Sequence, residues 1–319
     1  MFSKEINFGG YVVSETSTPF VIAEISANHN NDLERAKKLI EEAAASGAQA
    51  VKFQTYKAST ITLNSDREEF VIRGGLWDGR TLYDLYSEGS LPWEWHKELF
   101  KHARKFGLVV ISSPFDETAV DFLVGLGVDA LKIASFELCH IPLIEKCASA
   151  GLPIIISTGM GTFDEVNEAL TALSRNHAND VVVLHCISSY PAKPDDFNLP
   201  RIRRLREEFD VLVGLSDHCV DNHIAVASVA LGATVIEKHF TLDREGGGLD
   251  DTFSILPHEL RNLVKSASDT KKAMLEKEQL SDGESESIAY RRSIYAATDI
   301  QEGEIFTECN LKVVSPGLG

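Results

Sequence analysis

The sequence predicts an α/β protein whose main part is a (β/α)8 barrel, the TIM-barrel fold, and three observations lead to this prediction. Short apolar runs rich in β-branched residues recur eight times along the chain. Helical patterns stand between consecutive runs. No GxGxxG or Walker sequence is present, which counts against the alternative of a doubly wound open sheet. Eight strand–helix units in about 250 residues are the signature of the barrel.

The predicted strands are apolar stretches bounded by turn residues. Residues 1–20 precede the first strand, and INFGGYVVS (6–14) has the pattern of a small hairpin. We expect this N-terminal hairpin to plug the N-terminal mouth of the barrel. The strands are VIAEIS (21–26), AVKFQTY (50–56), LVVISSPF (108–115), ALKIAS (130–135), PIIISTGM (153–160), VVVLHCISSY (181–190), VLVGLSDH (211–218) and TVIEKHF (234–240).

Helical patterns alternate with the strands. LERAKKLIEEAAASG (33–47) and WEWHKELFKHARKFG (93–107) both stop at a glycine, which is a strong C-cap signal. A long connection (57–92) separates them after the second strand. The remaining helices are predicted over 118–127, 141–151, 163–176, 199–209, 223–232 and 256–275.

Composition divides the chain into three parts. Residues 1–278 hold the barrel with its hairpin, and QLSDGESESIA at 279–289 is polar and acidic, as a linker is. Residues 290–319 contain short strand-like pieces and turn signals. A tail of about 30 residues cannot bury a core of its own. We expect it to dock on the barrel or on another subunit, or to begin a longer domain.

Charge and composition exclude several classes of partner. The chain has 319 residues, is 44% hydrophobic and carries a net charge of −17, so it lacks the basic face that nucleic acid binding requires. No apolar run reaches the roughly 18–20 residues of a membrane span, and the N-terminus lacks the apolar core of a signal peptide. We therefore expect a cytoplasmic protein. Its five cysteines form no CxxC pair and are expected to be free thiols.

Polar side chains mark the C-terminal end of every predicted strand, whereas the strand starts are almost wholly apolar. Barrel enzymes place their catalytic residues at the C-terminal ends of the strands, so this mouth is the predicted active site. In chain order, the ends carry Glu24; Lys52 and Gln54; Ser112 and Ser113; Lys132 and Ser135, with Glu137 beyond; Ser157 and Thr158; His185, Ser188 and Tyr190; Ser216, Asp217 and His218; and Glu237, Lys238 and His239.

His218 and His239 are candidate metal ligands. They end the last two strands, and neighbouring strands lie about 4.8 Å apart, so two imidazoles can converge on one ion. Strand alternation points His239 into the barrel mouth and Lys238 toward the helices. Two protein ligands would leave positions open for substrate oxygens, as Lewis-acid catalysis requires. The alternative is a pair of hydrogen-bonded polar residues.

Lys52 and Lys132 are candidates for holding an anion. Several serines surround them at the strand ends, and ammonium and hydroxyl groups together suit a phosphate or a carboxylate. One lysine could instead form a Schiff base, as in barrel aldolases. Glu24 and Glu137 are candidates for acid–base work or sugar recognition. The alternative for each glutamate is an ion pair with one of the lysines.

Several linked motifs resemble the sialic acid synthase family: ISANHNNDLERAKKLIEEAAASGAQAVKFQTY, SSPFDETAVDFL, LKIASFE, STGM, GLSDH and EKHFTLDR. GGLWDGRTLYDLY (74–86) resembles its pseudaminic acid synthase branch. The family joins phosphoenolpyruvate to an acetamido-sugar aldehyde and releases phosphate and a nine-carbon 2-keto acid. The resemblance implies a homodimer and a small C-terminal antifreeze-like (SAF) domain that reaches into the partner's site.

The resemblance also implies roles for individual residues. Phosphoenolpyruvate would be held by Lys52, Gln54, Ser113, Lys132, Ser135, Ser157 and Ser216, with Ser188 and Tyr190 nearby. His218 and His239 would bind a divalent metal, Mn²⁺ or alternatively Mg²⁺. Glu24, Tyr190 and Asp250 would contact the sugar, with Glu137 nearby.

The expected reaction joins phosphoenolpyruvate and 2,4-diacetamido-2,4,6-trideoxy-L-altrose into pseudaminate. Synthesis of N-acetylneuraminate or legionaminate is the alternative, followed by a Schiff-base aldolase and an inactive sugar-binding pseudoenzyme. Two departures from the family concern the tail. Ser315 stands where the family has an arginine, and the chain ends at Gly319, so 290–319 is expected to be an incomplete start of the antifreeze-like domain.

Overall fold

A computed structural model describes residues 1–276 and 278–317 of the chain. It divides into two compact units, Met1–Met274 and Leu275–Gly319. The first unit contains the predicted barrel, and the second begins a few residues before the predicted end of the barrel part at residue 278.

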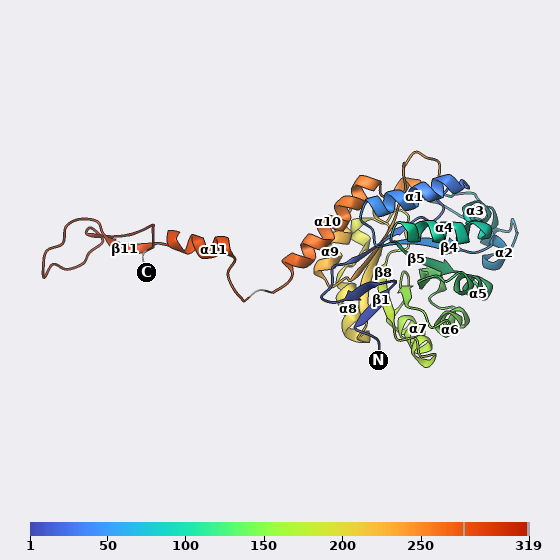
Figure 1. The fold of residues 1–319 in the computed structure, drawn as a ribbon, viewed down its shortest axis with the longest axis horizontal. Helices are drawn as coiled ribbons and strands as arrows, with labels where there is room; N and C mark the ends of the chain where they lie inside the picture. The colour runs from blue at the N-terminus through green and yellow to red at the C-terminus, as the bar shows by residue number, and fades with distance from the viewer. Residues whose placement is uncertain (277, 318–319) are drawn as a thin grey trace. The chain divides into compact units, whose positions relative to one another are not determined.

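Eight parallel strands close into a barrel, which confirms the predicted fold class (Figure 1). The last strand pairs with the first, so His239 lies beside Glu24 in the register. Each strand begins within one residue of its predicted start, and all eight end before the predicted last residue, where the chain enters the loops. The strands are β3 (Phe20–Glu24), β4 (Ala50–Thr55), β5 (Val109–Pro114), β6 (Ala130–Ile133), β7 (Ile154–Ser157), β8 (Val181–Cys186), β9 (Leu212–Asp217) and β10 (Val235–His239).

Helices surround the barrel, and their apolar faces pack against the outer side of the strands. The connection after β4, for which the sequence predicts no helix, contains α2 (Ala58–Ile61) and α3 (Leu82–Gly89). The Thr81 side chain caps α3 by accepting a hydrogen bond from the Asp84 amide. The predicted helices are α1 (Leu33–Ala45), α4 (Trp93–Lys105), α5 (Glu117–Gly125), α6 (Ile141–Ser149), α7 (Phe163–Arg175), α8 (Pro200–Phe209), α9 (His223–Ala230) and α10 (Pro257–Ala273).

The N-terminal hairpin closes one mouth of the barrel, as the sequence predicts. It consists of β1 (Glu5–Phe8) and β2 (Tyr11–Ser14). The side chains of Ile6, Phe8 and Val13 are fully buried in one cluster with the inward-facing residues of the strands. This apolar plug occupies the N-terminal half of the interior, so polar groups can gather only at the other mouth.

The second unit contains α11 (Asp282–Ser287) and a hairpin of β11 (Ser293–Ala296) and β12 (Leu311–Val314). The short helix lies within the predicted linker 279–289. It starts there because Ser281 and Glu284 form a capping box. Ser315 donates a hydrogen bond to the carbonyl of Tyr290 at 2.9 Å within the same unit.

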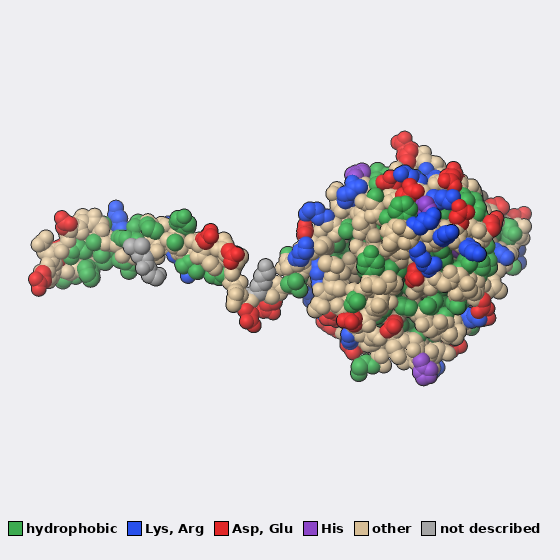
Figure 2. All heavy atoms as spheres, viewed as in Figure 1, with side chains coloured by type: hydrophobic (Ala, Val, Ile, Leu, Met, Phe, Trp, Pro, Cys, Tyr) green, Lys and Arg blue, Asp and Glu red, His purple; other side chains and the backbone are tan. Residues whose placement is uncertain are grey.

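Surface charge and helix length bear on possible partners. On the face of the barrel unit seen in Figure 2, Lys and Arg side chains are mixed with Asp and Glu, and no purely basic face appears. This agrees with the net charge of −17. Across residues 1–276 and 278–317, no helix is long and apolar enough to cross a membrane.

Candidate active site

The polar strand ends meet in a small cavity of about 50 Å³ at the C-terminal mouth of the barrel. A second, larger cavity of about 390 Å³ adjoins it and shares Gln54, Tyr190 and His239 with it. Of the predicted site residues, Lys52, Gln54, Ser113, Lys132, Ser135, Ser157, Tyr190, Ser216, His218 and His239 line the small cavity. Glu137, Ser188 and Asp250 line the large one, together with Gln54, Tyr190 and His239. Glu24 lies behind them and contacts Lys52 and Gln54.

A buried network of charges forms the floor of the small cavity. The Lys132 Nζ lies 2.9 Å from both carboxylate oxygens of Glu237. The Lys52 Nζ lies 2.5 Å from Glu24 Oε2 and 3.8 Å from Glu237 Oε1. The ion-pair alternative for Glu24 is therefore what the structure contains, and the same alternative is not seen for Glu137. Two buried cations with two carboxylates make a nearly neutral floor, which can exchange a carboxylate contact for an incoming anion.

The pKa values follow from these contacts. Burial would lower the pKa of Lys52, but Glu237 and Glu24 outweigh it and raise that pKa. Burial lowers the pKa of Lys132, Glu237 offsets only part of this effect, and the nearby positive charge of Lys52 lowers the pKa further. Burial would raise the pKa of Glu237, but Lys132 and Lys52 lower it to about 2. Glu237 is therefore a carboxylate at neutral pH.

Glu237 is a central site residue that the sequence analysis noted at a strand end without assigning it a role. Strand alternation was the available signal, since it places Glu237 on the same side as His239. The same alternation points Lys238 away from the cavity. Its Nζ binds Asp217 Oδ2 at 2.9 Å on the helix side of the strands, which confirms the predicted orientation of both residues.

His218 and His239 approach each other at the edge of the small cavity, as predicted. Their ring centroids are 5.3 Å apart. The Nδ1 of His218 lies 2.7 Å from the carbonyl of Ile187, and its ring also binds the buried thiol of Cys186. The Nδ1 of His239 is buried without a hydrogen bond and lies 3.5 Å from Asp250 Oδ2. Among the described residues, no group of three or more His, Cys, Asp or Glu could hold a metal, so this histidine pair is a two-ligand candidate.

The large cavity carries buried polar atoms that lack a partner. The Ser188 hydroxyl and Glu137 Oε2 have no hydrogen bond, and neither has the Ser157 hydroxyl in the small cavity. Burial raises the pKa of Glu137 from 4.5 to about 7. Leaving such groups unpaired costs about 1–3 kcal/mol each. Their convergence therefore indicates a site built for a polar ligand.

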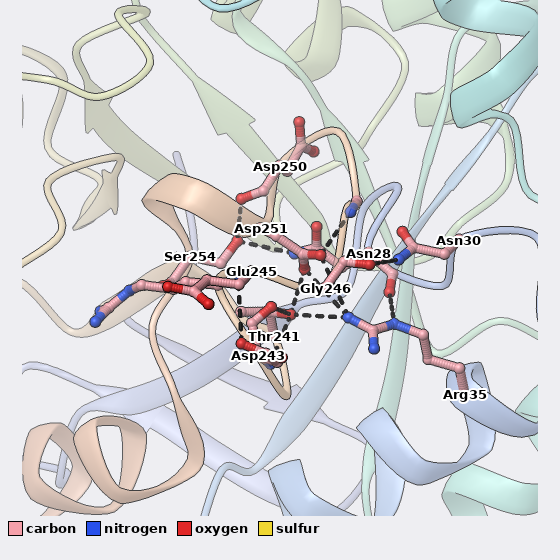
Figure 3. A network of polar contacts seen from close by, with 12 residues as sticks. Asn28, Asn30, Arg35, Thr241, Asp243, Glu245, Gly246, Asp250, Asp251 and Ser254 are labelled. Carbon is pink, nitrogen blue, oxygen red and sulfur yellow. Dashed lines mark hydrogen bonds and ion pairs between the residues drawn. The ribbon is translucent and has the colours of Figure 1, made fainter.

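Asp250 reaches the cavity from the loop that follows β10. Ser26, in the loop after β3, donates a hydrogen bond to its carboxylate. The polar network behind it is drawn in Figure 3, where Asp250 points away from the neighbouring Asp251. Asp251 contacts Arg35 of α1 instead. The two loops are thus joined beside the candidate metal ligands, because barrel closure places β10 next to β3.

The fold and the site together define an α/β-barrel enzyme with buried lysines, serines and two histidines at its C-terminal mouth. Residues 39–279 match the NeuB family, and the chain belongs to that family. It is 41% identical over 303 residues to a pseudaminic acid synthase of Helicobacter pylori, covering 94% of this chain and 89% of that protein.

Other relatives extend the comparison. A pseudaminic acid synthase of Campylobacter jejuni is 42% identical over 301 residues, covering 94% of this chain and 88% of the relative. An N,N'-diacetyllegionaminic acid synthase of Campylobacter jejuni is 41% identical over 305 residues, covering 94% of this chain and 91% of the relative. The crystal structure of an N-acetylneuraminic acid synthetase from Leptospira borgpetersenii superposes with a TM-score of 0.80 and 32% identity, covering 90% of this chain and 96% of that one.

Proposed function

We propose that this protein is a pseudaminic acid synthase. It would condense phosphoenolpyruvate with 2,4-diacetamido-2,4,6-trideoxy-L-altrose and release phosphate. Relatives at 41–42% identity that carry this name support the reaction. The observation that carries the class of sugar, a diacetamido-trideoxy hexose, is the chemistry of the large cavity, which has a polar floor and an apolar wall.

The apolar wall comes largely from the connection after β4. Its side chains face Leu249 and Phe136 from other loops, whereas Gln54, Ser188 and Asp250 form the polar floor. From the connection, the wall residues are Ile61, Ile72, Trp77, Leu82, Leu85 and Tyr86. A 6-deoxy carbon and acetamido methyl groups fit such a wall. A sugar with hydroxyl groups at these positions would leave them without hydrogen bonds, at a cost of about 1–3 kcal/mol each.

The small cavity fits phosphoenolpyruvate. In our proposal Lys52 and Lys132 neutralise the phosphate and carboxylate, and hydroxyl groups complete the hydrogen bonds. The unpartnered Ser157 hydroxyl is one of them. The others are Ser113, Ser135 and Ser216, with Gln54 at the edge of the cavity. Incoming oxygens would take over part of the contacts that Glu237 and Glu24 make with the lysines.

The histidine pair fits a divalent metal, and we propose Mn²⁺, with Mg²⁺ as the alternative. The carbonyl of Ile187 orients the His218 ring, which is a common arrangement behind metal-bound imidazoles. The His239 Nδ1 faces Asp250 Oδ2 at 3.5 Å, so this carboxylate would orient the His239 ring as the Ile187 carbonyl orients that of His218. When bound, the ion would supply Lewis-acid polarisation of the sugar aldehyde.

The residues of the chain then position the two substrates. Asp250 would hold a hydroxyl group of the sugar, and Tyr190 would pack between the two cavities. Glu24, which the resemblance assigns to the sugar, lines neither cavity and instead binds Lys52 and Gln54. The C3 carbon of phosphoenolpyruvate attacks the aldehyde carbon, water adds at C2, and the C2–O bond to phosphate breaks to leave the keto acid. Glu137, with its pKa near 7, can accept a proton from that water and pass it to the alkoxide oxygen formed from the aldehyde, and the proton of the C2 hydroxyl group leaves with the phosphate.

Legionaminic acid synthesis is the second candidate, because a synthase of that product is 41% identical to the chain. Phosphate release with Mn²⁺ and each candidate sugar in turn decides between them. Release only with the diacetamido-altrose supports the proposal, and release with the gluco-type diacetamido sugar moves the chain to the legionaminate branch. Release with N-acetylmannosamine would overturn the argument from the apolar wall. Trapping of pyruvate by borohydride would indicate the Schiff-base aldolase. The cytoplasmic location and the homodimer stay predictions.

A further inference from the structure

The loop after β10 is held in place by a buried carboxylate that does not face the cavity. Asp251 is fully buried and accepts hydrogen bonds from the Thr241 hydroxyl and, at 2.6 Å, from the Gly248 amide. Arg35 of α1 lies 3.3 Å from it. Figure 3 shows Arg35 and Thr241 converging on Asp251. One side chain thereby joins the start of the loop, its tip and a helix that is far away in sequence.

Further contacts join the same loop to the loop after β3. The Arg35 Nε donates to the carbonyl of Asn28 at 2.7 Å. The Asn28 amide donates to the Phe240 carbonyl at 3.0 Å and to the Ser254 hydroxyl at 2.8 Å. Ser254 in turn donates to the carbonyl of Asp250 at 2.6 Å. The carbonyl of Asp250 is therefore tied through Ser254 and Asn28 to the loop after β3.

Two glycines in the loop show how closely its backbone packs on the side chains of Arg35 and Asp251. A Cβ at Gly246 would lie 2.8 Å from Arg35 Nη2, and one at Gly248 would lie 2.7 Å from Asp251 Oδ2. Real Cβ atoms essentially never approach so closely, so a side chain at either position would push the Arg35 or Asp251 side chain out of its place. The loop is shaped around the pair of charges.

Asp250 points the other way from its neighbour. Its carboxylate accepts a hydrogen bond from Ser26 and lies 3.5 Å from the His239 Nδ1, at the edge of the large cavity. We propose that Arg35 and Asp251 are a positioning pair, which holds the loop so that Asp250 meets the sugar. This inference rests on the proposed function, because it assigns the sugar to the cavity that Asp250 lines.

The test compares Asp251→Asn with the wild-type full-length chain. Asparagine keeps the shape, but its NH2 group must take the place of one carboxylate oxygen. It then faces either the Gly248 amide, which loses its acceptor, or Thr241 and Arg35, where the attraction to the guanidinium is lost. We expect the KM for the sugar to rise tenfold or more. The KM for phosphoenolpyruvate should stay within twofold, because Lys52 and Lys132 lie outside this network.

A second measurement does not depend on turnover. Hydrogen exchange of the free protein should become at least tenfold faster at the amide of Gly248 and across 241–254 in Asp251→Asn, and should be unchanged in β4 to β9. Arg35→Lys keeps a cation but loses the planar fork, so it should give a smaller rise in the sugar KM than Arg35→Gln. The double variant, Arg35→Gln with Asp251→Asn, should have a sugar KM no higher than that of the single variant with the higher KM.

Asp129→Asn is the matched control. Asp129 also pairs with an arginine, Arg104, at 3.3 Å, and it also accepts a backbone hydrogen bond, from Val110. It lies at the N-terminal start of β6, away from the cavity. The Asp129→Asn variant should have a lower melting temperature than wild type and unchanged KM values for the sugar and for phosphoenolpyruvate.

A sugar KM within twofold of wild type in Asp251→Asn, or exchange of 241–254 that does not change, would overturn the proposal. A lower melting temperature with unchanged KM would do the same, because it would show a structural role alone. If the wild-type protein turned over no candidate sugar, the proposed function would fail separately, and hydrogen exchange would still decide whether the pair holds the loop.

Discussion

Replacing Lys132 by methionine tests both the ion pair and its proposed use. Lys132 is 2% exposed and Glu237 4%, and each carboxylate oxygen of Glu237 lies 2.9 Å from the ammonium group. Methionine keeps the unbranched stem and removes the cation. Glu237 would then depend on Lys52 at 3.8 Å.

The expected cost follows from the burial of the pair. Removing one partner of a buried ion pair costs about 3–5 kcal/mol, because the other charge remains out of water. Because Lys52 stays near Glu237, we expect a loss of about 3 kcal/mol, measured by urea unfolding with linear extrapolation. Phosphate release from phosphoenolpyruvate should be lost in the same variant, since one of the two cations for the substrate anion is gone.

A double variant separates stability from binding. Lys132→Met with Glu237→Gln removes both charges, and replacing both members of a buried pair is often close to neutral, so most of the lost stability should return. Phosphate release should not return. The exposed pair of Lys146 and Asp121 is the control, and Lys146→Met should leave the free energy of unfolding almost unchanged.

Two results would refute this reasoning. Unchanged stability of Lys132→Met would mean that the lysine and Glu237 are not paired in solution. Recovery of phosphate release in the double variant would mean that Lys132 does not bind the substrate anion.

Three further predictions concern ionisable groups. His239→Ala should abolish both phosphate release and any rise in melting temperature on adding Mn²⁺, and a metal-dependent rise that persists would contradict the metal site. Burial raises the pKa of Glu137 from 4.5 to about 7, so its stabilisation is complete below pH 4.5 and is lost as the pH rises through 7. Glu137→Gln should accordingly gain up to about 3 kcal/mol over wild type between pH 4 and pH 8, and equal pH profiles of unfolding would count against a buried carboxyl. Burial lowers the pKa of His96 from 6.5 to about 4, so the stability it provides is complete above pH 6.5 and is lost as the pH falls through 4. His96→Gln should therefore flatten the acid limb of the urea-unfolding profile by up to about 3 kcal/mol, and a profile parallel to that of wild type would exclude this origin.

Much of the fold and the site could be predicted because barrel strands carry their own direction. All eight run parallel, so their C-terminal ends share one mouth, and a polar residue at a strand end can be placed there from sequence alone. Alternation then separates the inward His239 from the outward Lys238, and the structure agrees. These inferences need only local order along each strand.

The pairing of charges could not be predicted, because it depends on distances across the barrel. Nothing in the sequence says that Glu237 would lie between Lys132 and Lys52, although strand alternation placed it on the cavity side. The wall of the large cavity is a similar case. Its residues come from a connection that has no strand to orient it, so only packing against Leu249 and Phe136 decides which side chains face inward.

The sequence by itself determined the strand order, the mouth that holds the site and most of its polar residues, because those follow from patterns of period 2 and 3.6 along the chain. Only the tertiary structure decided that Asp250 faces the cavity while Asp251 turns to Arg35. Barrel closure brings β10 beside β3, and contacts between residues more than 200 positions apart arise from that closure and leave no local signal.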